Sequence, residues 1–240
     1  MKSKQILFYG MIVTMSLMLS SCWFMWGSVN GNGNVTEEVR QVREFDQIEV
    51  SRGMNVYITQ GSPARVVVIA DSNLHDVIET SMQVGVLKIY SDENISRAEE
   101  KKVMVTVENL TEVSASTGSN VYSQNQIRAQ DLILSASTGS NLTMDLNVQN
   151  LEAECSTGSN VILSGRAKEA SLKGSTGSNL KGKELITGNC HMRASVGANV
   201  YASVTERLKA EASSGGNIIY YGEPAQTNIE HSSGGNIHGR

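Results

Sequence analysis

The chain has 240 residues, with 20 basic and 24 acidic side chains, 5% aromatic residues and a formal net charge of −4. This acidic balance gives no support for nucleic-acid binding, which normally shows a basic stripe. Two prolines and abundant Ser, Thr, Asn, Val and Ile favour β-structure over helix, in one large domain or two small ones.

Residues 1–21 have the pattern of an export signal. Lys2 and Lys4 precede an apolar run that ends at Leu19, and small residues follow directly before Cys22. The ending LSSC resembles a bacterial lipobox, which implies cleavage before Cys22 and acylation of its thiol. An uncleaved membrane anchor is the alternative, although the run is short and interrupted by polar residues.

Residues 22–40 are predicted to form the lipidated N-terminus and a flexible tether, because Gly27 to Asn34 is rich in glycine and asparagine. Trp23, Phe24 and Trp26 either rest at the lipid interface or are chance aromatics of a linker. The expected partner of this region is the membrane. We expect an exported protein that is lipid-anchored in the bacterial cell envelope, in the outer membrane, on its surface or periplasmic face.

Residues 41–110 alternate between apolar and polar positions in several short stretches, as strands do. One stretch, SRGMNVYI at 51–58, places Gly53 and Asn55 in phase with a motif that recurs later in the chain. We therefore expect irregular first coils of the same fold here. A separate small β-domain over 45–110 is the alternative, and 91–102 is expected as an exposed loop or short helix.

Residues 111–240 repeat one motif seven times, as STGSN, SVGAN or SSGGN, every 18 to 21 residues. Glycine suits a sharp bend because it accepts positive φ without a Cβ penalty. With the earlier copy, the predicted corner glycines are Gly53, Gly118, Gly139, Gly158, Gly177, Gly197, Gly215 and Gly235.

Between the corners the sequence alternates with the period of a strand. The position three residues after the glycine is wholly aliphatic, which indicates one face of a continuous core. The position four before the glycine is polar and points outward; stacking would place Glu154 beside Lys173, and Arg193 beside Glu211.

An asparagine accompanies every corner. In stacked coils about 4.8 Å apart, identical amides can hydrogen-bond along a ladder. The predicted ladder is Asn55, Asn120, Asn141, Asn160, Asn179, Asn199, Asn217 and Asn236. The fold class is therefore all-β: a single-stranded right-handed parallel β-helix with coils of about 19 residues, over 41–240. The varying step excludes a rigid left-handed hexapeptide helix and predicts a variable loop on one edge.

The stretch FDQIEVSRGMNVYITQG and the repeated G-x-N-[IVL] corners resemble the head GIN domain family of auto-transporter adhesins of bacterial envelopes. The resemblance covers about 40–240. It implies a right-handed β-helix related in shape to pectate lyases, a role in adhesion, and no catalytic apparatus. An auto-transporter head implies a membrane-barrel translocator, and nothing follows Arg240, so we expect a lipid anchor instead.

The residues themselves predict no catalytic, cofactor or metal site. Glu211 and Glu230 are the nearest pair of outward acids, and His191, His231 and His238 do not converge on one place. Cys155 and Cys190 fall two coils apart, about 10 Å, beyond the reach of a disulfide, and are expected as buried free thiols.

The predicted function is a non-enzymatic envelope lipoprotein that displays an adhesion rod. Tyr57, Tyr122 and Tyr201 occupy one outward column and are candidate ligand contacts, for a glycan or a host or envelope protein. The alternatives are a polysaccharide-active enzyme, which would use Glu211 or Glu230, and a structural or assembly protein that forms homo-oligomers through an open β-end.

Overall fold

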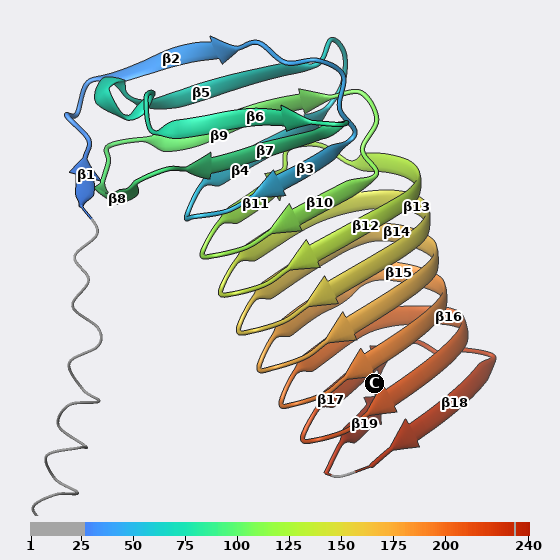
Figure 1. The fold of residues 1–240 in the computed structure, drawn as a ribbon. Coiled ribbons are helices and arrows are strands. Elements are labelled where there is room, and N and C mark those ends of the chain that lie inside the picture. Colours follow the sequence, from blue (N-terminus) through green and yellow to red (C-terminus); the bar gives the residue numbers. More distant parts are fainter. Residues whose placement is uncertain (1–26, 233) are drawn as a thin grey trace, which may run out of the picture.

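The structure is a computed structural model that describes residues 27–232 and 234–240 (Figure 1). The described chain is built of strands, with one 3-10 turn at Ser72–Leu74. Within these residues no helix has the length and apolar character to cross a membrane. The predicted signal segment and Cys22 lie outside the described residues.

Strands follow the apolar alternation of the sequence. The N-terminal third forms β1 (Ser28–Asn30), β2 (Val35–Arg40), β3 (Gln47–Val50), β4 (Asn55–Gln60), β5 (Arg65–Asp71), β6 (Ile78–Gln83), β7 (Val86–Ser91), β8 (Asn94–Arg97) and β9 (Lys101–Val107). The repeats form β10 (Glu112–Ala115), β11 (Asn120–Ser123), β12 (Ile127–Ala136), β13 (Asn141–Cys155), β14 (Asn160–Gly174), β15 (Asn179–Ala194), β16 (Asn199–Ala212), β17 (Asn217–Tyr221), β18 (Gln226–His231) and β19 (Asn236–Gly239).

The repeats stack as a parallel β-solenoid, which confirms the predicted architecture (Figure 1). We call the side formed by the strands that lead into each G-x-N corner the front face. It consists of β10, β12, the later parts of β13–β16, and β18. The back face consists of β11, the first parts of β13–β16, β17 and β19.

Each G-x-N corner whose two central residues the structure describes is a tight turn with two left-handed residues. In the first regular copy φ is 50° at Thr117 and 70° at Gly118, and the N–H of Ser119 donates to the carbonyl of Ser116 at 3.2 Å. Positive φ at both central residues is the pattern of a type I′ turn. The residue before the glycine is therefore strained, most of all where it is β-branched, as at Thr117.

The last corner glycine is Gly234, so the prediction of Gly235 was wrong. The motif SSGGN holds two glycines, and positive φ occurs at Gly234 (78°). Only this choice keeps the asparagine two residues after the corner glycine, as in the other copies. Gly235 takes the place that Ser119 holds in the first copy, where a Cβ would collide with the backbone of Ala212.

The second edge of each regular coil is a smooth bend, so the expected variable loop is absent from β13–β16. Each of these strands runs for 14 to 16 residues around the edge without a break. Register shifts near Ile162 and between Gly182 and Ile186 absorb the differences in coil length. Bulges of this kind let a strand bend without losing its pairing.

The N-terminal region differs from the expected succession of coils. β3 and β4 do form a coil, in register with β10 and β11. Residues 61–107 instead fold back: β5 runs antiparallel to β2 and β9, and β6 antiparallel to β7. β7 and β9 then pair with β3 and β4 on the edges opposite to those that pair with β10 and β11. Residues 91–102, expected as a loop or helix, contain β8, which pairs with β1.

We call the N-terminal region with strands β1–β9 the cap. One hydrophobic core runs from this cap to the last coils. It includes Phe45 near its beginning and Ile218 near its end, and the aliphatic column that follows the corners is fully buried at Val121, Leu142 and Val161. A single 17-stranded sheet carries both regions. The cap therefore shares its core with the solenoid, which speaks against a separate small β-domain.

Candidate functional site: a groove along the front face

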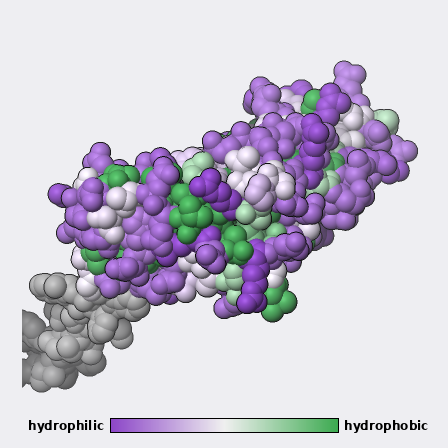
Figure 2. Space-filling model, turned by 90° about the horizontal axis from the view of Figure 1, so that it is seen from above, coloured by the Kyte–Doolittle hydropathy of each residue, from purple (hydrophilic) through white to green (hydrophobic). Residues whose placement is uncertain are grey.

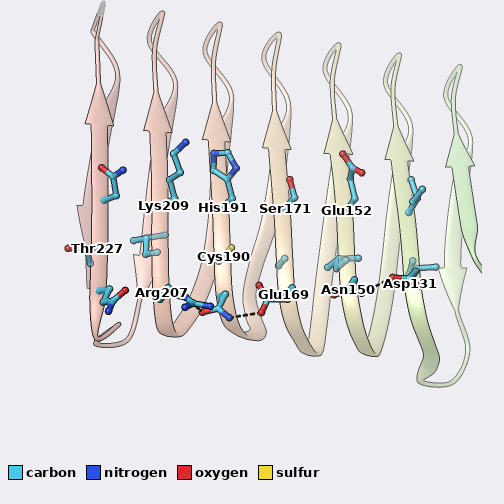
Figure 3. A pocket seen from close by; sticks show the side chains of 18 residues that line it. Asp131, Asn150, Glu152, Glu169, Ser171, Cys190, His191, Arg207, Lys209 and Thr227 are labelled. Carbon is cyan, nitrogen blue, oxygen red and sulfur yellow. Dashed lines mark hydrogen bonds between the residues drawn. The ribbon is translucent and has the colours of Figure 1, made fainter.

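A groove of about 810 Å³ runs along the front face across six coils (Figure 3). Its two walls are columns of side chains in register, on either side of a column that is mostly buried. The first wall consists of Asp131, Asn150, Glu169, Asn189, Arg207 and Gln226, and the second of Ile133, Glu152, Ser171, His191, Lys209 and Asn228. Five coil spacings of about 4.8 Å give the groove a length of roughly 24 Å.

Hydrogen bonds between neighbouring coils fix the first wall (Figure 3). The side-chain amide of Asn150 donates to Asp131 at 2.7 Å, and that of Asn189 donates to Glu169 at 2.6 Å. Arg207 Nε in turn donates to Asn189 at 2.9 Å. These exposed side chains are thus held in place before any ligand arrives, which lowers the entropy cost of binding.

Charge divides the groove along its length. The acids among its lining residues, Asp131, Glu152 and Glu169, lie on three successive coils. His191, Arg207 and Lys209 lie on the next two coils. Figure 2, which views the molecule from above, shows a mainly hydrophilic surface with apolar residues in small patches. The groove itself combines polar walls with an apolar floor, which is formed by Leu132, Leu151, Ala170, Cys190 and Leu208.

Two ion clusters border the groove, at the pairs that stacking predicted. Lys173 Nζ lies 2.6 Å from Glu152 and 2.8 Å from Glu154, and these hydrogen bonds raise the pKa of Lys173. The Glu211 carboxylate binds Arg193 at 2.7 Å, together with Lys209 at 2.6 Å and His191 at 3.1 Å.

The Glu211 cluster bears on the enzyme hypothesis. Hydrogen bonds from Arg193, Lys209 and His191 lower the pKa of Glu211 to about 2. Glu230 lies next to it in register on β18. A general acid must carry a proton near the working pH, and Glu211 stays ionised there. Glu211 is therefore unsuited to the general-acid half of the role that the alternative required. Among the described residues no group of three or more His, Cys, Asp or Glu side chains could hold a metal ion.

The structure brings together two of the three candidate tyrosines. The rings of Tyr57 and Tyr122 stack with centroids 5.2 Å apart and an angle of 22°. Tyr201 lies in the same column on the back face, but Thr143, Ile162 and Lys181 occupy the coils in between. Because the stacked rings cover one face of each other, this pair offers a sugar less aromatic surface than separate tyrosines would.

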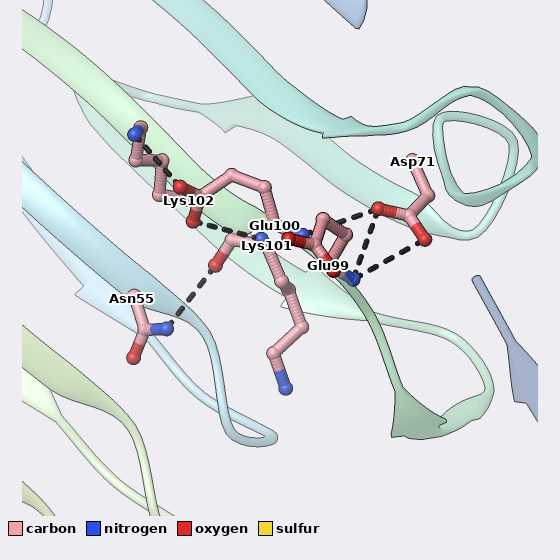
Figure 4. Close-up of polar contacts among 6 residues, drawn as sticks. All are labelled: Asn55, Asp71, Glu99, Glu100, Lys101 and Lys102. Carbon is pink, nitrogen blue, oxygen red and sulfur yellow. Dashed lines mark hydrogen bonds and ion pairs between the residues drawn. The ribbon is translucent and has the colours of Figure 1, made fainter. Parts of the chain in front are cut away.

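The eight asparagines line up at the corner as a ladder of amides. Each side-chain nitrogen donates to the side-chain oxygen of the asparagine in the preceding coil, at 2.8 to 3.1 Å. At the cap the ladder ends on the backbone, where Asn55 donates to the carbonyl of Lys101 at 3.2 Å (Figure 4). With donors and acceptors used along the stack, these amides support the fold rather than a ligand.

A buried carboxylate, which no sequence pattern predicted, joins three backbone segments of the cap (Figure 4). Asp71 is 1% exposed and accepts backbone N–H groups of Gly33 at 2.9 Å, Glu100 at 3.1 Å and Glu99 at 3.2 Å. These bonds hold the pKa of Asp71 below its usual value. No local motif marks Asp71, because its partners lie 28 to 38 residues away.

Cys155 and Cys190 are buried free thiols, as predicted. Burial raises the pKa of both, that of Cys190 to about 12, so neither is a reactive thiolate near neutral pH.

Comparison with known structures agrees with this architecture. A Bacteroides fragilis protein titled "putative adhesin" superimposes with a TM-score of 0.82 at 18% identity, covering 88% of this chain and all of its own. Two Parabacteroides distasonis proteins, titled "Putative lipid binding protein" and "putative adhesin", give TM-scores of 0.70 and 0.68 at 16% and 21% identity, covering 89% of this chain and all of theirs. At these identities the likeness establishes the fold.

No curated protein matches the sequence. The family described as "Putative auto-transporter adhesin, head GIN domain" matches residues 44–224, which extend from β3 to β17. The chain belongs to this head GIN domain family.

Proposed function

We propose that the protein is a non-enzymatic lipoprotein of the bacterial cell envelope that displays its solenoid as an adhesion rod. Three observations support the proposal: the adhesin family, the solenoid fold shared with proteins titled as adhesins, and the signal-like segment that ends at Cys22. The observation that carries it is the front-face groove, which spans six coils and whose walls consist mostly of polar and charged side chains, several of them held by hydrogen bonds.

The position of the cap fits an N-terminal anchor. β1 lies at the cap end of the solenoid (Figure 1), and Cys22 precedes Gly27 by five residues. Five residues reach at most about 18 Å. An acylated Cys22 would therefore hold the cap near the membrane and leave the later coils, with most of the groove, directed away from it.

The groove favours an elongated polar partner. Carboxylates accept hydrogen bonds, guanidinium and ammonium groups donate them, and amides do both. A glycan chain or an extended polypeptide could satisfy such a row of groups along several coils. Repeated weak contacts of this kind gain strength when many copies are displayed on one surface.

The anchor is tested by growing producing cells with an alkyne-bearing fatty acid. The expected result is labelling of the wild-type protein in the membrane fraction, and loss of label with release from the membrane for Cys22→Ser. Labelling that survives Cys22→Ser, or an unlabelled wild-type protein, would contradict the lipid anchor.

Binding is tested with the non-acylated chain, residues 22–240 carrying Cys22→Ser, on an array of glycans and envelope and host proteins. We expect retention of an elongated polar ligand that weakens for Glu169→Lys and persists for Lys181→Glu, a change on the back face. Release of cleaved products from a bound glycan would instead establish an enzyme and overturn the non-enzymatic proposal.

A further inference from the structure

We propose that the front face binds the front face of a second copy, with the two solenoid axes antiparallel. This inference builds on the proposed adhesion function and names its partner. The observation is the charge pattern of the outward columns. In these columns four acids stand against one base on β12–β14, and four basic or titratable nitrogen side chains stand against one acid on β15–β16. The first group is Asp131, Glu152, Glu154 and Glu169 with Lys173, and the second is His191, Arg193, Arg207 and Lys209 with Glu211.

The pattern is self-complementary about its middle coil. Registers place β12 and β16 two coils on either side of β14, and β13 and β15 one coil on either side. A twofold axis along the strand direction of β14 reverses the order of coils and keeps each column opposite itself. It would set β12 of one copy against β16 of the other, and β13 against β15, as an isologous interface requires.

Complementary side chains then meet in each column, two of the pairs being carboxylate with guanidinium and one carboxylate with imidazole. Along the first wall of the groove, Asp131 of one copy opposes Arg207 of the other. Along the second wall, Glu152 opposes His191. In the third column Glu154 opposes Arg193. The symmetry doubles these three pairs to six. A parallel arrangement would instead keep the acidic coils opposite acidic coils, which costs energy.

The middle coil is the unfavourable part of this arrangement. Glu169 of one copy faces Glu169 of the other, and Lys173 faces Lys173 in the same way. Both charges are already engaged within one chain, Glu169 by Asn189 at 2.6 Å and Lys173 by its two glutamates. The repulsion is therefore partly compensated.

The size and composition of the face predict a weak, wet contact. Five coils of about 4.8 Å and a strand width of about seven residues give roughly 500 Å² per copy, or about 1,000 Å² in total. This is the low end for a specific interface. Ile133, 43% exposed, would face the aliphatic stem of Lys209 of the second copy. Exposed ion pairs are screened, so the association must weaken with salt.

The antiparallel arrangement matches adhesion between two surfaces. The chain enters the solenoid at the cap end (Figure 1), so antiparallel rods have their entry points at opposite ends. If each rod is anchored there, the two anchors belong to opposing membranes. Membranes bridged in this way would be held apart by roughly the length of the stacked coils, about 40 Å.

The experiment is a charge swap read by sedimentation equilibrium of the non-acylated chain at low salt. We expect a monomer–dimer equilibrium that shifts to monomer at 1 M salt, where the screening length falls to about 3 Å. Asp131→Arg and Arg207→Asp should each weaken the dimer by about tenfold or more, since each turns two symmetric attractions into repulsions. The double variant should restore wild-type association, and Lys181→Glu on the back face should leave it unchanged.

Restoration is the decisive result. The double variant has lost the native hydrogen bonds of both side chains, so only a contact between the two positions can recover the dimer. A wild-type chain that stays monomeric at millimolar concentration and low salt, or a double variant no better than the single ones, would overturn the proposal. Circular dichroism of each variant verifies the fold. Such a result would not affect the proposed lipid anchor or the proposed glycan or protein ligands, because separate experiments test those.

Discussion

The side-chain amide of Asn160 donates to the side-chain oxygen of Asn141 at 3.0 Å, and Asn160 accepts the same bond from Asn179 at 3.1 Å. Both neighbours belong to other coils, so each asparagine in the interior of the ladder couples three coils. The repeated G-x-N motif therefore stabilises the stack through side chains as well as through the strand ladders.

Asn160→Ala should destabilise the protein by about 1–3 kcal/mol, because two hydrogen bonds are lost and two amides are left without their partners. Urea denaturation followed by circular dichroism measures the free energy of unfolding. The control is Asn236→Ala at the end of the ladder, which removes only one bond to another coil, the bond to Asn217. An Asn160 variant no less stable than the Asn236 variant would show that the ladder contributes nothing cooperative.

Val196→Asn should stabilise the protein by about 1 kcal/mol. Val196 precedes a corner glycine with φ of 48° and is 56% exposed, so little burial is lost. Asparagine tolerates left-handed backbone far better than a β-branched residue. Val35→Asn on the extended strand β2 serves as the control and should be neutral or slightly destabilising. Equal effects at the two positions would exclude relief of corner strain.

Gly165→Ala should cost roughly 3 kcal/mol or more, because Gly165 combines φ of 96° with a Cβ position that collides with the carbonyl oxygen of Leu146. Gly158→Ala is the matched comparison. Its φ is 69° and its Cβ would meet nothing within 4 Å, so only backbone strain of about 1–2 kcal/mol remains. Thermal and urea unfolding should rank the variants in this order, and the reverse order would refute the role of Gly165 at the bend.

The stabilising effect of Glu211 should disappear in acid. Its pKa is lowered from 4.5 to about 2 by Arg193, Lys209 and His191. A lowered pKa means that the contribution is complete above about pH 4.5 and is lost as the pH falls towards 2. The difference in unfolding free energy between wild type and Glu211→Gln should therefore shrink over this window. Glu184→Gln, away from the cluster, is the control. A difference independent of pH would argue against a charged Glu211.

The regular coils could be derived from the sequence because their information is local and repeated. The glycine and asparagine of each motif fix the corner, and the aliphatic column at Val121 and its equivalents fixes which side is buried. The same regularity predicted the ion pairs of Lys173 with Glu154 and of Arg193 with Glu211, since parallel registers set equivalent residues side by side.

The cap and the groove could not be derived in this way. Residues 61–107 carry strand patterns but no corner motif, and a strand pattern does not state which strand is its partner or its direction. Asp71 binds N–H groups brought together by that unexpected topology. The groove depends on the shape of the front face across six coils, whereas the tyrosine column could be read from one repeat position.

The most direct test of the account is adhesion of cells that display the anchored wild-type chain, measured beside two variants. The front-face variant carries Glu152→Lys and Glu169→Lys, and the back-face variant carries Lys181→Glu. The account predicts adhesion for wild type and the back-face variant and its loss for the front-face variant at equal surface amounts. Equal adhesion by all three would contradict the assignment of binding to the groove.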